Sequence, residues 1–320
     1  MNRKNTFALT ALLTIISFVI SGCAFSSHAK QYLSFRRTEN SIALLNDSNN
    51  IIWQLNFDKK YDKPFFHPVA LADGTVLTEC RPKDHPWHRG LWWSWKFLNG
   101  LNYWEDDPNT WIAPGRNEIV QTDYTQLIDG STLVKLTVSY HPPDKPEVLS
   151  EVRILKISPI NADGGYRIDW TSAFTAADED VLFDRTPIIG DPCGVVWGGY
   201  AGLSVRLVRD SKNCQIVDSE GHTYNKEFNN AKAKWLDYTF EVAGKPAGIA
   251  ILDHPSNLRH PTPWYVIITK DMRYFSPAFI YYEPYTLKAH QSLTLKYRII
   301  IHPGRTDSAS MEKQWTEFSK

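Results

Sequence analysis

A period-two alternation of apolar and polar residues runs along most of this chain and is the feature that most limits its fold. The pattern is clear at residues 133–138, 152–154, 203–207 and 293–301. Side chains of a β-strand point alternately to its two faces, so each stretch predicts a strand. Turn-forming runs, such as DGS at residues 129–131, separate these stretches. The sequence therefore predicts an all-β protein.

We expect the strands to form a large antiparallel β-sandwich, of the supersandwich or jelly-roll type, with few short helices. Helical periodicity is convincing only at residues 311–318, which predict a short amphipathic helix packed on or beside a sheet. No repeat period stands out, which argues against a propeller or a solenoid. Residues 33–320 are long enough for one large β domain, and we expect a single β-sandwich domain there.

The N-terminus has the pattern of a bacterial lipoprotein signal. A cationic head precedes an apolar run at residues 7–20, which is shorter than the ~20 residues that span a bilayer. Small residues before Cys23 match a lipobox, in which the cysteine thiol receives lipid. We expect a signal peptide at residues 1–22 and a lipidated linker at residues 23–32. The predicted location is the cell envelope, with Ala24 favouring the outer membrane, on its periplasmic or surface face.

Charge and cysteine content exclude several classes of protein. The 35 basic and 35 acidic side chains cancel, so we expect no nucleic-acid partner. Cys80, Cys193 and Cys214 remain after Cys23, an odd number that allows one disulfide pair but no disulfide framework. The sequence also lacks a P-loop, a G-x-S-x-G elbow, an H-E-x-x-H motif and a C-x-x-C pair.

The densest group of chemically versatile residues is RPKDHPWHRGLWWSWKFLNGLNYWE at residues 81–105. Pro82 and Pro86 prevent a regular helix across His85 and His88, so both histidines are expected on an irregular segment that converges on a pocket. Acid–base catalysis or substrate binding, a metal pair, and a structural role all remain open for them.

A second segment, LDHPSNLRHPTPW at residues 252–264, repeats the Asp-His-Pro step followed by a histidine and an arginine. Because of this likeness, we expect the two segments to face each other across one cleft, which would add His254 and His260 to the first pair of histidines. The alternative is that Asp-His-Pro is a convenient turn in both places. A divalent metal on the first pair would need further ligands from this segment or from Glu105.

Between the two lies WGGYAGLSVR at residues 197–206, where two adjacent glycines permit close backbone approach before a strand. Tyr200 and Arg206 flank the bend. Arg206 is expected on the face opposite the apolar side chains of this strand. If that face lines a cleft, Arg206 binds an anion; if it faces solvent, Arg206 has no such role.

Twelve tryptophans are more than a β core of this size needs, and many lie between residues 87 and 111. Aromatic rings pack on the apolar faces of sugars, so the cluster indicates a sugar-binding surface. Packing in the core is the alternative for any single tryptophan.

The segments DHPWHRGLWWSW, WGGYAGLSVR and LDHPSNLRHPTPW, in this order, resemble those of bacterial β-rich proteins labelled the "methane oxygenase PmoA" family. The resemblance extends from about residue 64 to residue 302. The label does not fit, because the methane monooxygenase subunit spans the membrane several times and this sequence shows no span after its signal. The resemblance implies a carbohydrate-active protein, similar to lyases or dehydratases of uronic-acid oligosaccharides.

We therefore expect β-elimination on a uronic-acid-containing oligosaccharide during polysaccharide degradation. An arginine neutralises the carboxylate, a base removes the proton at C5, and an acid protonates the group that leaves C4. The candidate catalytic residues are His85, His88, Tyr200, His254 and His260. The candidate substrate-binding residues are Arg89, Arg206 and Arg259 for the carboxylate, Trp92, Trp93, Trp95 and Trp104 for the ring faces, and Glu105 for hydroxyl groups.

Two alternatives remain open from the sequence. A glycoside hydrolase would need two carboxylates ~5 to ~10 Å apart. The candidate carboxylates are Glu105, Asp106, Asp107, Asp184, Asp191 and Glu283. A non-catalytic sugar-binding lipoprotein is the other alternative. Elimination requires no cofactor, although a divalent metal remains possible with His85 and His88 as its ligands.

Overall fold

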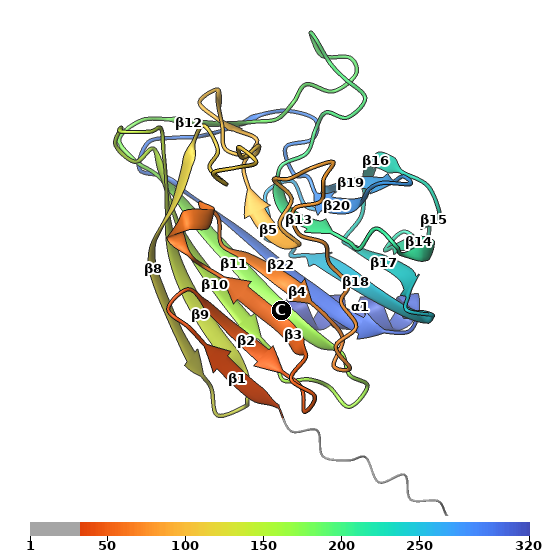
Figure 1. Ribbon diagram of the computed structural model, residues 1–320. Helices are drawn as coiled ribbons and strands as arrows, with labels where there is room; N and C mark the ends of the chain where they lie inside the picture. Colours follow the sequence, from red (N-terminus) through yellow and green to blue (C-terminus); the bar gives the residue numbers. More distant parts are fainter. Residues whose placement is uncertain (1–32) are drawn as a thin grey trace, which may run out of the picture. The chain divides into compact units, whose positions relative to one another are not determined.

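Two nine-stranded antiparallel sheets dominate the computed structural model, which describes residues 33–320 (Figure 1). The prediction of a large antiparallel β-sandwich is confirmed. The first sheet contains, in spatial order, β1 (Ser34–Arg37), β2 (Ser41–Leu45), β3 (Ile51–Asn56), β4 (Phe65–Val69), β5 (Leu91–Ser94), β13 (Gly202–Arg206), β20 (Arg273–Pro277), β19 (Pro263–Ile268) and β16 (Phe228–Lys232).

The second sheet contains the longest strands, including those whose alternation is clearest in the sequence. In spatial order these are β15 (Thr223–Tyr224), β14 (Lys212–Asp218), β17 (Trp235–Val242), β18 (Lys245–Asp253), β22 (Ser292–Pro303), β11 (Tyr166–Ala176), β10 (Leu149–Ile157), β9 (Thr132–His141) and β8 (Arg116–Gln126). A third, four-stranded sheet contains β21 (Tyr285–Leu287), β12 (Val181–Asp184), β6 (Phe97–Leu98) and β7 (Leu101–Asn102).

Aromatic pairs between the two large sheets show that they pack face to face. The ring centroids of Trp93 on β5 and Phe174 on β11 are 5.3 Å apart. Those of Phe275 on β20 and Tyr238 on β17 are 5.5 Å apart. These residues belong to one large buried cluster that fills the space between the sheets. Burial of such side chains stabilises the fold by roughly 25 cal/mol per Å² of apolar surface.

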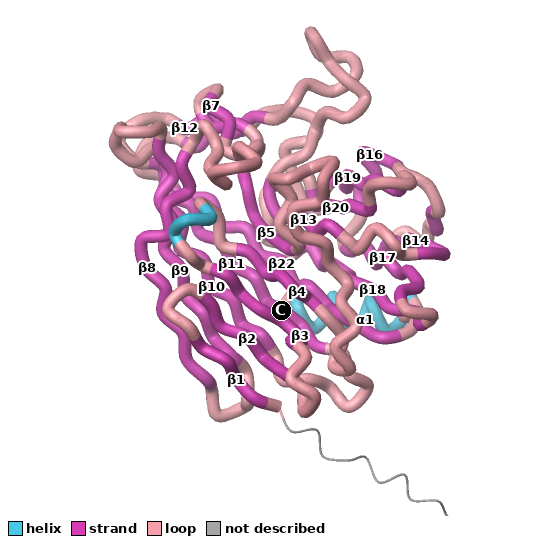
Figure 2. The backbone as a smooth tube through the Cα atoms, viewed as in Figure 1, coloured by secondary structure: helices cyan, strands magenta, loops and turns pink. Residues whose placement is uncertain are grey.

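Helices are few, as Figure 2 shows. A short 3₁₀ helix, η1, spans Lys59–Tyr61, and the helix predicted at residues 311–318 is confirmed as α1 (Ser308–Phe318). Asp307 caps α1 by accepting a 2.9 Å hydrogen bond from the Ser310 amide. The helix buries Met311 against the outer face of the second sheet, beside Trp235 and Leu252.

The predicted signal peptide (1–22), the linker (23–32) and Cys23 lie outside the described residues. Within residues 33–320, no helix has the length and apolar character needed to cross a membrane. Residues 33–320 form one compact unit. The three cysteines that this unit contains are all free: Cys80, Cys193 and Cys214.

Alternation along the strands of the first sheet determines which side chains leave the core. On β5, Trp93 points between the sheets, whereas its neighbour Trp92 belongs to a separate aromatic cluster on the outer face. On β20, Phe275 points inward and Tyr274 outward in the same way. The outer face of the first sheet therefore carries a second, smaller aromatic cluster, on which the candidate site is built.

Candidate functional site

A pocket of about 460 Å³ lies over the outer aromatic cluster of the first sheet. Its wall is mainly aromatic and contains a single carboxylate. The residues that line it are His85, Trp87, His88, Trp104, Glu105, Trp197, Tyr200, Tyr265, Ile267, Met272 and Tyr274. We call this the aromatic pocket. Concave, largely apolar sites with a few polar groups are typical of small-molecule binding.

His88 is packed within the pocket wall. Its ring is stacked on Tyr274, with the centroids 5.3 Å apart, and lies 5.0 Å from Trp92 beneath it. Its Nδ1 is buried and has no hydrogen-bond partner among residues 33–320. Burial, together with the nearby charges of His85 and Arg206, holds the pKa of His88 well below its usual value. The ring is therefore neutral at physiological pH.

His85 is more accessible and is oriented by a carboxylate. Its Nδ1 donates to Oδ2 of Asp84 at 2.8 Å, which leaves Nε2 as the basic nitrogen. Asp84 also accepts hydrogen bonds from Arg206 at 2.8 Å and from Arg209 at 2.7 Å. Burial acts to raise the pKa of Asp84, but the hydrogen bonds from His85 and Arg206 outweigh it and the pKa is lowered. Asp84 is therefore ionised and fixes the tautomer of His85.

Glu105 and Tyr200 form the second polar group of the pocket. The Tyr200 hydroxyl donates to Glu105 at 3.3 Å, and Lys96 and Asn102 donate to the same carboxylate at 2.5 and 2.6 Å. Burial, and then the charge of Glu105, raise the pKa of Tyr200 far above its usual value. Tyr200 is therefore a protonated donor at neutral pH. The ring of Trp104 lies 5.0 Å from that of Tyr200.

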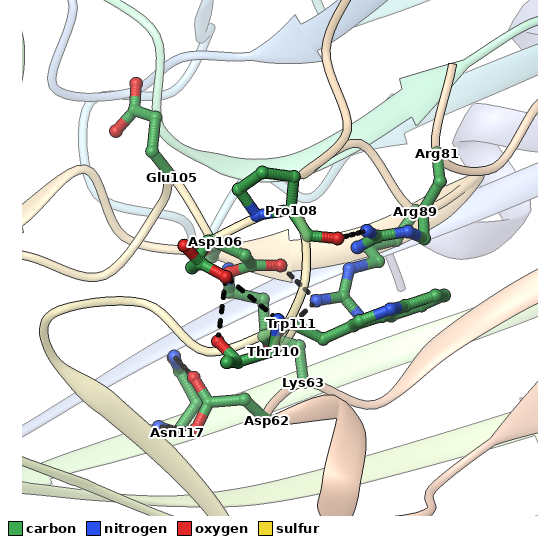
Figure 3. A network of polar contacts seen from close by, with 12 residues as sticks. Asp62, Lys63, Arg81, Arg89, Glu105, Asp106, Pro108, Thr110, Trp111 and Asn117 are labelled. Carbon is green, nitrogen blue, oxygen red and sulfur yellow. Dashed lines mark hydrogen bonds and ion pairs between the residues drawn. The ribbon is translucent and has the colours of Figure 1, made fainter. Parts of the chain in front are cut away.

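A buried ionic network holds the segment that supplies Trp104 and Glu105 (Figure 3). Asp106 is fully buried and pairs with both Lys63 and Arg89. Lys63 also donates to the carbonyl of Trp104 at 2.9 Å. Figure 3 shows Glu105 pointing away from this network. The predicted anion-binding Arg89 therefore has a buried structural partner and does not line the pocket.

Arg206 and Arg259 are likewise engaged elsewhere. Arg206 lies on the face opposite Leu203 and Val205, as predicted, but its side chain is fully buried against Asp84. Arg259 donates to the carbonyls of Phe279, Glu283 and Pro284, at 3.1, 2.7 and 2.9 Å. None of the three predicted arginines lines the aromatic pocket.

The second Asp-His-Pro segment forms a separate structural unit beside α1. His260 Nδ1 donates to the buried carboxylate of Asp253 at 2.7 Å, and its ring is stacked on Trp315 of α1. The ring of His254 lies against Phe318 of the same helix. The structure thus brings His85, His88 and Tyr200 together and leaves these two histidines out of the pocket.

The predicted sugar platforms divide into three positions. Trp104 lines the pocket, and Trp92 lies beneath it in the outer cluster. Trp93 and Trp95 are buried between the sheets, 1% and 0% exposed, because their side chains alternate to the inner side. Neither of these two can contact a sugar in the folded protein, so their assignment as platforms is corrected to core packing. Trp92 is also 0% exposed and does not line the pocket, so its assignment is corrected to packing beneath the pocket.

Within residues 33–320, His85 and His88 have no third side chain placed to complete a metal site. Among residues 33–320, no group of three or more His, Cys, Asp and Glu side chains converges in the way that a metal site requires. The segment that was expected to complete the site packs beside α1 instead.

Six pocket residues were not among the sequence candidates: Trp87, Trp197, Tyr265, Ile267, Met272 and Tyr274. Tyr265 and Ile267 alternate along β19, so they share a face, but the alternation does not say that this face carries a site. Trp87 and Trp197 lie inside the segments that drew attention to the histidines and to Tyr200. Their aromatic side chains were the only feature of the sequence that could have indicated a place in the site.

The chain belongs to the family described as "Family of unknown function (DUF6807)", whose sequence profile matches residues 43–316. A search of curated protein sequences gives no significant match.

Several solved structures are similar at low identity. The alpha-galactosidase from Lactobacillus brevis has 9% identity over 88% of this chain and 40% of its own, with a TM-score of 0.43. The galactosidase domain of the alpha-galactosidase-sucrose kinase AgaSK has 6% identity over 85% and 40%, with a TM-score of 0.39. The Slr1438 protein from Synechocystis sp. PCC 6803 has 9% identity over 91% and 100%, with a TM-score of 0.37. The chain thus spans about 40% of the first two proteins. Similarity at this level carries no assignment of activity.

Proposed function

We propose that the protein is a carbohydrate-active enzyme that binds a sugar residue in the aromatic pocket and catalyses β-elimination on it. The observation that carries the proposal is that an oriented histidine, His85, and a protonated tyrosine, Tyr200, line the same aromatic pocket. The partly exposed ring of Trp87 offers apolar surface for the face of a sugar, and the rings of Trp104 and Tyr265, 1% and 4% exposed, form the wall behind it. Glu105 offers acceptors for its hydroxyl groups.

The proposed reaction moves one proton off carbon and one onto oxygen. Nε2 of His85 takes the proton from the carbon next to an electron-withdrawing group, and the electron pair forms a carbon–carbon double bond. The bond from the neighbouring carbon to its oxygen substituent breaks, and Tyr200 gives its proton to the departing oxygen. A departing alkoxide is basic enough to take this proton. Solvent then removes the proton from His85 and restores that of Tyr200.

The electron-withdrawing group is expected to be uncharged. A free uronate carboxylate would need an unpaired cation nearby, but no lysine or arginine lines the aromatic pocket, and the adjacent Lys96 is paired with Glu105. The three predicted arginines are committed to Asp106, to Asp84 and to backbone carbonyls. An ester or a carbonyl group acidifies the adjacent carbon without adding charge. We therefore favour an esterified uronate or a carbonyl-bearing sugar over a free uronate.

The pocket favours elimination over hydrolysis. Hydrolysis of a glycosidic bond generally uses two carboxylates, and Glu105 is the single carboxylate among the residues that line the pocket. Sugar binding without catalysis would not need the bond between His85 and Asp84. One experiment distinguishes elimination from hydrolysis and from sugar binding without catalysis.

The experiment incubates the purified full chain with free and methyl-esterified oligogalacturonates and follows ultraviolet absorbance, reducing ends and product mass. The proposal expects a rise in absorbance from the conjugated double bond, larger with the esterified substrate. New reducing ends without that absorbance would mean hydrolysis and overturn the proposal. Binding without any product would leave a sugar-binding protein.

We also propose that the chain is anchored to the cell envelope through lipid on Cys23, with the outer membrane as the destination. The support is the signal pattern before this cysteine. The partners that follow from both proposals are an oligosaccharide and a membrane surface.

A further inference from the structure

Trp197 stands at the rim of the aromatic pocket. Its side chain lines the pocket, yet 53% of the residue is exposed to solvent. Other tryptophans of the site, such as Trp104, are almost completely buried. Trp197 therefore presents apolar surface both to a ligand inside the pocket and to whatever extends from it.

The backbone around Trp197 is held in place rather than loosely attached. It belongs to the connection between β12 and β13, drawn in green, which projects at the top of Figure 1. The Tyr265 hydroxyl donates to the Trp197 carbonyl at 3.1 Å. The Gly199 amide donates to the Thr186 carbonyl at 2.9 Å, which closes the base of the connection. Gly198 has no room for a side chain, because a Cβ there would lie 2.1 Å from the carbonyl oxygen of Pro187.

An ionic contact adds to this support. Arg185 donates to Asp191 at 2.8 Å, and the same carboxylate accepts from the Ile188 amide at 3.1 Å. Exposing a large aromatic ring to water is unfavourable, and exposed apolar surface next to a pocket is typical of a binding site. Because the backbone is held in this way, ligand stacking on Trp197 restricts only the side chain and costs little further conformational freedom.

The position of Trp197 distinguishes a sugar subsite from a surface for a protein partner. Val196 and Ile189 on the same connection are also exposed, 75% and 66%, but neither lines the pocket. Trp197 alone of the three joins the pocket to the outside.

We infer that Trp197 forms a second sugar subsite, so that the ligand is an oligosaccharide with one residue in the pocket and the next stacked on Trp197. This inference rests on the proposed function for the nature of the ligand. It adds that affinity rises from monosaccharide to disaccharide and that Trp197 supplies the increase.

The test is calorimetric titration of the purified full chain and its variants with two series. One series is glucose, cellobiose and cellotriose; the other is methyl-esterified galacturonic acid and its dimer and trimer. For the series that binds, the dissociation constant of the disaccharide should be about tenfold lower than that of the monosaccharide. Trp197→Ala should weaken disaccharide binding by about tenfold more than monosaccharide binding, and Trp197→Phe should keep most of the gain. Val196→Ala and Ile189→Ala are matched controls on the same connection and should bind as the wild type does.

The outcomes separate the two proposals. Monosaccharide binding without a gain for longer chains, or an equal loss at every chain length in Trp197→Ala, would overturn the subsite and leave the proposed function intact. Binding of neither series by the wild type would overturn both.

Discussion

Nδ1 of His85 lies 2.8 Å from Oδ2 of Asp84, and the fully buried Arg206 donates to the same oxygen at 2.8 Å. This chain of contacts links the outer face of the first sheet to the pocket. It orients the nitrogen proposed as the base and keeps Asp84 ionised.

Asp84→Asn should lower the rate of the proposed elimination by at least about tenfold, because the amide no longer selects the tautomer of His85. The effect should fall on kcat more than on KM. Arg209 is half-exposed and contacts the same carboxylate. Arg209→Ala should therefore lower the rate less than Asp84→Asn does. Steady-state kinetics of the two variants check this. Equal activity of Asp84→Asn and the wild type would contradict the role of Asp84.

The tryptophans should separate by function when truncated. Trp93→Ala removes a ring packed between the sheets and should lower the free energy of unfolding by about 3–5 kcal/mol. Trp87→Ala removes a ring from the pocket wall and should weaken sugar binding with little loss of stability. Urea unfolding and ligand titration of both variants measure these effects. The same loss of stability in both would be inconsistent with their different positions.

A buried ion pair within the core should be costly to break. Glu151 on β10 accepts hydrogen bonds from Arg153 at 2.7 Å, from Tyr140 at 2.5 Å and from Ser172 at 2.5 Å, and both charged side chains are almost completely buried. Glu151→Gln leaves the charge of Arg153 without its partner and should destabilise the fold by about 3–5 kcal/mol. The double variant Glu151→Gln/Arg153→Met should recover part of that loss. Urea denaturation measures the free energy of unfolding of both variants. A decrease below about 1 kcal/mol in Glu151→Gln would refute the prediction.

Acidification should destabilise the protein through His67. Burial lowers the pKa of His67 from 6.5 to about 4. Between these two pH values His67 is therefore protonated in the unfolded chain and neutral in the folded one. The contribution of His67 to the free energy of unfolding is fully present above pH 6.5. It falls by up to about 1.4 kcal/mol per pH unit between pH 6.5 and 4. His67→Gln should reduce that slope when unfolding is measured across this range. His302, whose pKa is raised beside Asp237, contributes with the opposite sign and serves as a comparison. An unchanged slope in His67→Gln would count against the assignment.

The lipid anchor can be tested separately from the pocket. Cells that express the full chain and are fed labelled palmitate should incorporate the label, and Cys23→Ser should abolish it and release the protein from the membrane fraction. Incorporation that persists in Cys23→Ser would contradict the proposed anchor. Neither result bears on the activity of the pocket.

The strands could be predicted because alternation is local, whereas the site depends on distant partners. Alternation places Trp92 and Trp93 on opposite faces, but the sequence does not say which face is the core. The alternation also placed Arg206 on the face opposite its apolar neighbours. It did not identify the ion-pair partner of Arg206, which is Asp84, 122 positions away. Contacts at such separation are set by how the strands are ordered in the sheet.

The two Asp-His-Pro segments show the limit of motif likeness. In the first, His85 faces a pocket and is oriented by its own neighbour in the chain. In the second, His260 packs on Trp315 of a helix that follows only after β22. The same residue types therefore line a pocket in one place and hold a helix against a sheet in the other.

The most direct test of the proposed mechanism compares His85→Ala with His254→Ala in the absorbance assay on methyl-esterified oligogalacturonate. Both substitutions remove a histidine that follows an aspartate and precedes a proline, but only His85 lines the pocket. The mechanism predicts that His85→Ala lowers the rate about 10²-fold or more and that His254→Ala retains the wild-type rate. Wild-type activity in His85→Ala would contradict the mechanism.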